Sequence, residues 1–184
     1  MSNNNSWQTL PKIKDKCVLG ADNGKSGFLV FLNLSGDIIY IEQFPDNAKR
    51  LYELINHFKP VYATIEAVFM AAGFKSVAST NFEIMGRYKQ VLEMLNISYE
   101  ATRAVSWRKK LNIKAKGREN QKLAAIQQAS KIFSDEDYKK LWTRYNKINK
   151  QTHHKEEIFE PDNNKCESAL IAYYSLKIYS ETLK

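Results

Sequence analysis

The chain has 184 residues, 43% of them hydrophobic, which is enough for one domain with a packed core and too few to expect two. Its 28 basic and 20 acidic side chains give a formal net charge of +8, which favours a polyanionic partner such as nucleic acid, although a merely soluble basic protein has the same composition. No apolar run approaches the roughly 20 residues that span a membrane, so a membrane-spanning protein is not expected.

The N-terminal residues 1–15 are polar and rich in asparagine, without the apolar core of a signal peptide, and they predict a flexible tail on a cytoplasmic protein. Residues 16–184 are then expected to form the single domain. Both cysteines, Cys17 and Cys166, lie in apolar runs and have no metal-ligand spacing. We therefore expect buried free thiols, as is usual in a reducing cytosol.

Strands are predicted first along the chain. Residues 18–21 and 28–34 are apolar enough for strands. The turn Ser35-Gly36-Asp37 joins the second of them to a third strand at 38–41. The sequence therefore begins its domain with a meander of consecutive strands.

A helix and a further strand come next. Asp46 can cap this helix, and Pro60 ends it before a strand at 61–66. The apolar residues between them follow helical spacing: Leu51, Leu54, Ile55 and Phe58. A crossover between parallel strands is the natural result.

The remainder is mainly helical. A long amphipathic helix is predicted from about 76 to 95, and a fifth strand at 98–102. Further helices are indicated at 105–111, 119–133, 135–150, and from 163 to the C-terminus. The order predicts an α/β protein with an RNase H-like fold. In that fold a five-stranded mixed sheet, whose first three strands form an antiparallel meander, is flanked by helices.

Acidic side chains end two of the predicted strands. Asp22 ends the first apolar run, and Glu66 ends the run of the fourth strand. A charge in such a position is costly unless it is paired or binds a cation. Glu167 opens the apolar part of the last helix. If the three acids converge, they can form a divalent-metal site that hydrolyses phosphodiesters.

Several segments in a specific order carry a family resemblance: Gly20-Ala-Asp22 with Gly27, Ile65-Glu66-Ala-Val-Phe69-Met70, Ser76 with Gly86 and Arg87, Val105-Ser-Trp107-Arg108, Lys122 with Ile132-Phe133, and Glu167-Ser-Ala-Leu-Ile-Ala172. From about Cys17 to the C-terminus, the chain resembles the RuvC family of Holliday junction resolvases, particularly its shorter phage-type members. The resemblance implies a homodimeric endonuclease that cuts branched DNA, such as a four-way junction, by paired symmetric nicks. It also implies a role in recombination, repair or phage genome processing, in a bacterial or phage-infected cell.

The expected chemistry uses two Mg²⁺ ions per site, with Mn²⁺ as a possible substitute, which activate water and stabilise the pentavalent phosphorane. Asp22 and Glu66 are predicted ligands, Asp22 as the bridge between the ions, and Glu167 completes the site. The fourth ligand is open between Asp162 and Asn164. We favour Asp162, although it is also a natural N-cap of the last helix.

Cations in the middle of the sequence are expected to bind DNA phosphates. This basic band consists of Lys75, Arg87, Arg108, Lys109, Lys110, Lys114, Lys116, Arg118 and Lys122. A solvated surface is the alternative interpretation for each of them. By the resemblance, Phe69 would stack on an unpaired base at the branch point, while core packing explains it equally well. Trp107 is expected to be a packing residue.

The segment at about 135–161 departs from the family pattern and predicts a helical insertion. Ser134 can cap a helix with one apolar stripe, formed by Tyr138, Leu141, Trp142, Tyr145 and Ile148. The insertion would extend the dimer interface or the DNA surface, or pack on its own subunit.

Two rival functions remain open from the sequence. One is another nuclease on the same fold that acts on flaps, forks or RNA-DNA hybrids, because a fold and a metal site do not define the substrate. The other is a non-catalytic protein that binds branched DNA.

Overall fold

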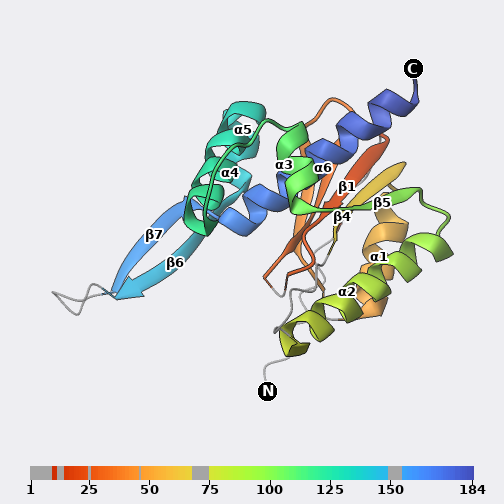
Figure 1. Cartoon of the computed structure of the whole chain (residues 1–184), viewed down its shortest axis with the longest axis horizontal. Coiled ribbons are helices and arrows are strands. Elements are labelled where there is room, and N and C mark those ends of the chain that lie inside the picture. The colour runs from red at the N-terminus through yellow and green to blue at the C-terminus, as the bar shows by residue number, and fades with distance from the viewer. Residues whose placement is uncertain (1–9, 12–14, 25, 46, 68–74, 149–154) are drawn as a thin grey trace.

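A five-stranded mixed sheet, in the order β3-β2-β1-β4-β5, forms the centre of the molecule (Figure 1). The computed structural model describes residues 10–11, 15–24, 26–45, 47–67, 75–148 and 155–184. The strands are β1 (Cys17–Ala21), β2 (Phe28–Asn33), β3 (Ile38–Gln43), β4 (Tyr62–Glu66) and β5 (Tyr99–Thr102). The first three form an antiparallel meander, β4 is parallel to β1, and β5 is parallel to β4. The predicted sheet is therefore confirmed.

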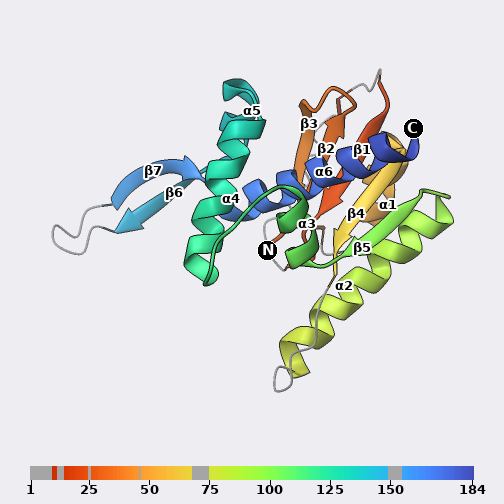
Figure 2. The same cartoon turned by 45° about the horizontal axis from the view of Figure 1, so that its top comes forward.

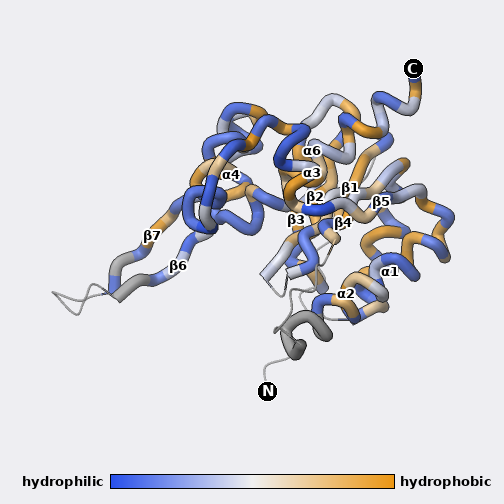
Figure 3. The backbone as a smooth tube through the Cα atoms, viewed as in Figure 1, coloured by the Kyte–Doolittle hydropathy of each residue, from blue (hydrophilic) through white to orange (hydrophobic). Residues whose placement is uncertain are grey.

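Helices cover both faces of the sheet (Figure 2). On one face lie α1 (Ala48–Phe58) and α2 (Lys75–Met94), and on the other α6 (Asn163–Thr182) with α3 (Ala104–Lys110) and α4 (Arg118–Ile132). Side chains alternate between these faces along each strand, so Leu19 joins the core beneath α1 while Val18 joins the core beneath α6. Figure 3 shows hydrophobic residues in the central strands, and hydrophobic and hydrophilic residues alternating along the helices around them.

Helix α1 begins at a different cap from the predicted one. The side chain of Asn47 accepts a hydrogen bond from the backbone N–H of Arg50 at 2.8 Å, which satisfies a donor of the first turn. Asp46, the predicted cap, lies outside the described residues. The apolar stripe was predicted correctly, because Leu51, Leu54, Ile55 and Phe58 are all buried.

The helix predicted at 135–150 is wrong beyond Lys140. Helix α5 (Asp135–Lys140) is capped by Ser134, as expected, but it is followed by a two-stranded hairpin of β6 (Trp142–Ile148) and β7 (Lys155–Pro161). The hairpin extends away from the sheet in both views (Figures 1 and 2). Aromatic and β-branched residues favour strands, and here Trp142 on β6 contacts Phe159 on β7, with ring centroids 5.0 Å apart. The apolar residues Trp142, Tyr145 and Ile148, which predicted one stripe on a helix, therefore belong to a strand.

Both cysteines are free and buried, as expected. Burial raises the pKa of the Cys17 thiol and that of the Cys166 thiol to about 12, which keeps them protonated. None of the helices in the described part of the chain has the length and apolar character needed to cross a membrane.

Candidate active site

Asp22 and Glu66 lie side by side at one edge of the sheet. In the parallel pair β1 and β4, Ala21 is opposite Ile65, so Asp22 and Glu66 are the next residues along the two strands. Both also follow the alternation toward the face covered by α6, since Ala21 and Ile65 point to the core beneath α1. The sheet register therefore brings two carboxylates from distant parts of the sequence together.

Helix α6 brings the third acid, Glu167, to the same edge. The helix lies so close to β1 that a Cβ atom at Gly20 would overlap the backbone nitrogen of Ala172. Near its N-terminal end, the hydroxyl of Ser168 accepts a hydrogen bond from the backbone N–H of Phe28 at 3.2 Å. These two contacts fix the position of α6 on the sheet, and with it that of Glu167.

The loop after Asp22 is equally tight. The backbone N–H of Gly24 donates to Asp22 Oδ1 at 3.0 Å, and the N–H of Gly27 donates to the Gly24 carbonyl at 2.7 Å. A Cβ atom at Gly27 would overlap the backbone carbonyl of Asp22. A glycine is therefore required at position 27, because the backbone of Asp22 approaches it closely.

Burial and neighbouring acidic charges raise the pKa of Asp22 and of Glu66. Burial is the main cause of the raised pKa of Glu66, which reaches about 7, and the charge of Asp22 adds to it. Burial likewise raises the pKa of Asp22, and the nearby Glu167 charge adds to it. The Gly24 N–H and Arg108 act in the opposite direction on Asp22. Asp22 and Glu66 are thus carboxylates whose charged forms are disfavoured mainly by burial, and a bound cation would favour those charged forms.

Helix α3 supplies a partner to each of two acids. The indole N–H of Trp107 donates to Glu66 Oε2 at 2.7 Å, and Arg108 Nη2 donates to Glu167 Oε1 at 2.7 Å. The Arg108–Glu167 pair is largely removed from water, with side-chain exposures of 18% and 15%. Trp107 is buried, as predicted for a packing residue, but it also holds a site carboxylate.

A cavity of about 490 Å³ opens over Asp22 and Glu66. Its lining includes Asn23, Asn81 and Arg103, together with Ala104 and Val105 at the start of α3. Glu167 is not among the described residues that line this cavity. One part of the acid cluster is therefore open to a ligand, while the other is closed by Arg108.

The donor atoms at this edge are of the type that a hard divalent cation prefers. Carboxylate and amide oxygens are typical ligands of Mg²⁺ and Ca²⁺. Asn23 is 3% exposed; its Nδ2 donates to the carbonyl of Glu66 at 2.5 Å, and its Oδ1 has no hydrogen-bond partner among the described residues. Nevertheless, within the described ranges no three His, Cys, Asp or Glu side chains are grouped closely enough to hold a metal ion. Asp22, Glu66 and Asn23 fit a cation, and Glu167 would first have to leave Arg108.

Asp162 and Asn164 lie elsewhere. Asp162 caps α6, where its Oδ1 accepts from the N–H groups of Asn164 and Lys165, and its Oδ2 accepts from Thr143 at 2.8 Å. Asp162 and Asn164 line a second cavity of about 490 Å³ between α4, the base of the hairpin and α6. This placement favours the capping role of Asp162, and its role as a fourth ligand stays a prediction.

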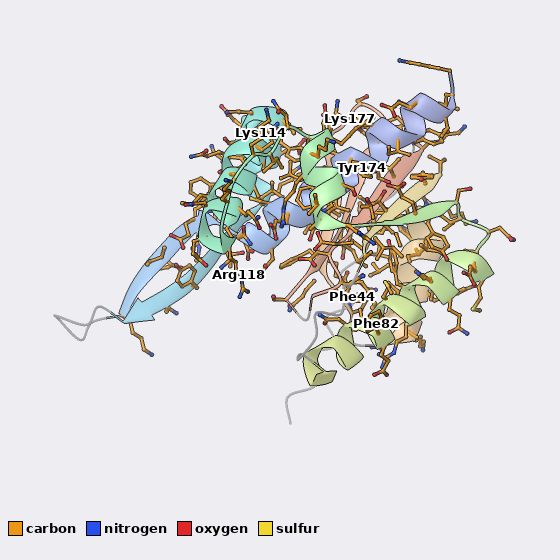
Figure 4. The ribbon with its side chains drawn as sticks, in the orientation of Figure 1. Phe44, Phe82, Lys114, Arg118, Tyr174 and Lys177 are labelled. Atoms are coloured by element: carbon orange, nitrogen blue, oxygen red, sulfur yellow. The ribbon has the colours of Figure 1, made fainter. Side chains whose placement is uncertain are left out.

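The basic band is divided between two sides of the molecule. Lys75 and Arg87 belong to α2, where Arg87 pairs with Glu83, and the side chain of Lys75 lies outside the described part. The remaining residues of the basic band, from Arg108 to Lys122, come after the cavity-lining residues in the sequence. They lie on α3, the next loop and α4, on the opposite face of the sheet from α2. Figure 4 shows Lys114 and Arg118 on this side. Phe69 lies outside the described residues.

Sequence reasoning missed two contributors to the site. Asn23 was given no role, although an amide directly after a strand-ending acid is a usable oxygen ligand. Trp107 was assigned to packing alone. Its single N–H donor could have predicted a hydrogen bond to another residue, because a buried indole usually finds an acceptor.

Comparisons with known proteins establish the fold. The sequence matches no protein-family model and no curated protein sequence. Among solved structures, Thermus thermophilus RuvC in complex with a Holliday junction substrate superposes with a TM-score of 0.62 at 12% identity, over 90% of this chain and 96% of that one. The chain has a RuvC-like fold. A second structure of Thermus thermophilus RuvC gives a TM-score of 0.57 with the same identity and coverage. This similarity shows the fold, and the RNase H-like prediction is confirmed at that level.

Proposed function

We propose that this protein is a metal-dependent endonuclease that resolves four-way DNA junctions by paired nicks. The observation that carries the proposal is the pair of carboxylates, Asp22 and Glu66, which the sheet register brings together at the edge of a cavity, where burial raises the pKa of each. The fold supports the choice of substrate, since the structure of Thermus thermophilus RuvC is described as a complex with a Holliday junction. The proposal includes that the protein acts as a homodimer in the cytoplasm of a bacterial or phage-infected cell.

Asp22 and Glu66 would hold the cations, with Asn23 and Glu167 as further oxygen donors. When bound, two divalent cations, Mg²⁺ or Mn²⁺, lower the pKa of water and neutralise the charge that develops on the phosphate. The protein's own residues prepare this site. Trp107 fixes the orientation of the Glu66 carboxylate, and the Gly24 N–H fixes that of Asp22.

Phosphate binding would come from the cations beside the cavity. The lysines 109, 114 and 116 and Arg118 are exposed along α3, the following loop and the start of α4. Such contacts position a DNA backbone without reading its sequence. A dimer would supply two such sites, one for each nicked strand.

Junction cleavage with strand mapping tests this proposal. A labelled four-way junction is incubated with the protein and Mg²⁺, alongside a flap, a fork, a duplex and an RNA-DNA hybrid. We expect symmetric nicks in the junction, and D22N and E66Q should abolish them. E136Q removes an exposed carboxylate of α5 and serves as the matched control. Cleavage by D22N or E66Q at the wild-type rate would refute the metal site, and preference for another substrate would refute the assignment as a resolvase.

One observation favours a second candidate, a non-catalytic protein that binds branched DNA. Among the described side chains no three-residue metal cluster is present, and Glu167 is already neutralised by Arg108. A binder would bind the junction with similar affinity with or without Mg²⁺ and leave every strand intact.

A further inference from the structure

The side chain of Arg108 takes the place of a cation at one of the acids. Its Nη2 donates to Glu167 Oε1 at 2.7 Å, and its guanidinium carbon lies 4.9 Å from the centre of the Trp107 ring. The pair is shielded from water, so the attraction is stronger than that of a surface ion pair. In this arrangement Oε1 of Glu167 is held by Arg108, and Glu167 is not among the described residues that line the cavity over Asp22 and Glu66.

Arg108 also retains unused hydrogen-bonding capacity. Its Nη1 reaches Gln121 Oε1 only at 3.3 Å, and its Nε is buried without a hydrogen-bond partner among the described residues. A buried donor without an acceptor is costly. The guanidinium fork matches a phosphate well, because it can offer two parallel N–H donors. An incoming phosphate could therefore satisfy Arg108 better than Glu167 does.

Helix α3 lies where such a phosphate would arrive. Ala104 and Val105 line the cavity over Asp22 and Glu66, and Val105 is 75% exposed. Arg108 follows Ala104 by four residues and so lies on the same side of the helix, one turn further on. A DNA strand in the cavity would then pass within reach of the Arg108 side chain.

We propose that Arg108 is a latch that DNA releases: it holds Glu167 in the free protein, and a backbone phosphate draws it away so that Glu167 joins Asp22 and Glu66. This inference rests on the proposed function and adds its regulation. Arg108 is a positioning residue here, since it acts through Glu167. The consequence is positive coupling between metal and junction binding, which protects the free protein from assembling a competent site without substrate.

The coupling can be measured without cleavage. Mn²⁺ is titrated calorimetrically into the metal-free full-length protein as wild type, R108Q and K109Q. Removing the competing cation should tighten Mn²⁺ binding by R108Q about tenfold, a typical size for coupling between sites. K109Q removes the neighbouring exposed charge and controls for the general electrostatic effect. Equal Mn²⁺ affinities of R108Q and K109Q would overturn the latch.

The same coupling must appear from the DNA side, because linkage is reciprocal. The affinity for a fluorescent four-way junction is measured by anisotropy in EDTA and in Ca²⁺ at constant ionic strength. Ca²⁺ should tighten binding by the wild type about tenfold, and by R108Q hardly at all. No effect of Ca²⁺ on the wild type, or the same effect on R108Q, would overturn the proposal. If R108Q fails to fold, the absence of a Ca²⁺ effect on the wild type still overturns the proposal, and R108K, which lacks the guanidinium fork, replaces R108Q in the comparison.

Failure of the latch and failure of the proposed function give different results. If D22N and E66Q bind Mn²⁺ as tightly as the wild type, no metal site exists at these acids and the proposed function falls. If both lose Mn²⁺ while R108Q gains nothing over K109Q, the metal site stands and only the role of Arg108 is refuted.

Discussion

Replacing Gly20 by alanine tests how the close packing of α6 on β1 builds the site. A Cβ atom at this position would lie 2.5 Å from the Cα atom and 2.7 Å from the Cβ atom of Ala172. Carbon atoms in good contact are about 3.5–4.0 Å apart, so α6 has to retreat by about 1 Å. The overlap is with backbone and cannot be relieved by a side-chain rotation. Overpacking of this kind costs about 1–3 kcal/mol.

The displacement of α6 also carries Glu167 away from Asp22. A misplacement of about 1 Å at a catalytic group can lower the rate about 100-fold, so G20A should lose junction cleavage even where it remains folded. Urea unfolding gives the change in stability, and single-turnover cleavage at a temperature where both proteins are folded gives the rate.

A matched control uses the same substitution where the space is free. Gly86 lies within α2, and an added Cβ atom would meet no atom within 4 Å. G86A should therefore raise stability by about 0.5–1 kcal/mol, because glycine is unfavourable inside a helix. If G20A is as stable and as active as G86A, the close contact of α6 with β1 does not exist in the protein.

Three further predictions concern individual side chains. In the absence of divalent metal, the pKa of Glu66 rises from 4.5 in the unfolded chain to about 7 in the folded protein. The folded state therefore binds this proton more tightly than the unfolded state. Its free energy of unfolding should fall by about 3 kcal/mol as the pH rises from about 4.5 to 7. E66Q should remove this loss in urea unfolding with EDTA, and a constant stability difference between the two proteins across that pH range would contradict the argument. W107F removes the indole donor that lowers the pKa of Glu66, so the acidic limb of the pH profile of cleavage should move to higher pH, and an unchanged profile would show that the hydrogen bond has no such effect. D162N should retain both the cap and cleavage, whereas D162A should lose about 1 kcal/mol of stability, and a cleavage defect in D162N with normal unfolding would identify a metal ligand instead.

Much of the fold could be predicted because local patterns determine it. The alternation of apolar residues and the Ser35-Gly36-Asp37 turn are enough for the meander, and the helical spacing from Leu51 to Phe58 is enough for α1. The segment after Lys140 was misassigned because Trp142, Tyr145 and Ile148 suit both a helical stripe and a strand. Only the pairing with residues 155–161, which the apolar spacing within 142–148 does not reveal, decides between the two.

The acidic residues of the candidate site could be predicted from the sequence, but the residues that hydrogen-bond to them could not. Asp22 and Glu66 could be found because each ends an apolar run, and a charge in that position needs a reason. Asn23, Trp107 and Arg108 become part of the site only through contacts between elements. No local pattern encodes such contacts, since they depend on how α3 is placed against β4 and α6.

Helix α3 contacts two of the three acids of the proposed site. Successive residues, Trp107 and Arg108, hold acids from two different elements, Glu66 from β4 and Glu167 from α6. The same short helix borders the cavity through Val105. A small movement of α3 would therefore change the environment of both carboxylates at once. Because α3 contacts both acids and also borders the cavity, it is a route by which DNA in the cavity could influence metal binding at these acids.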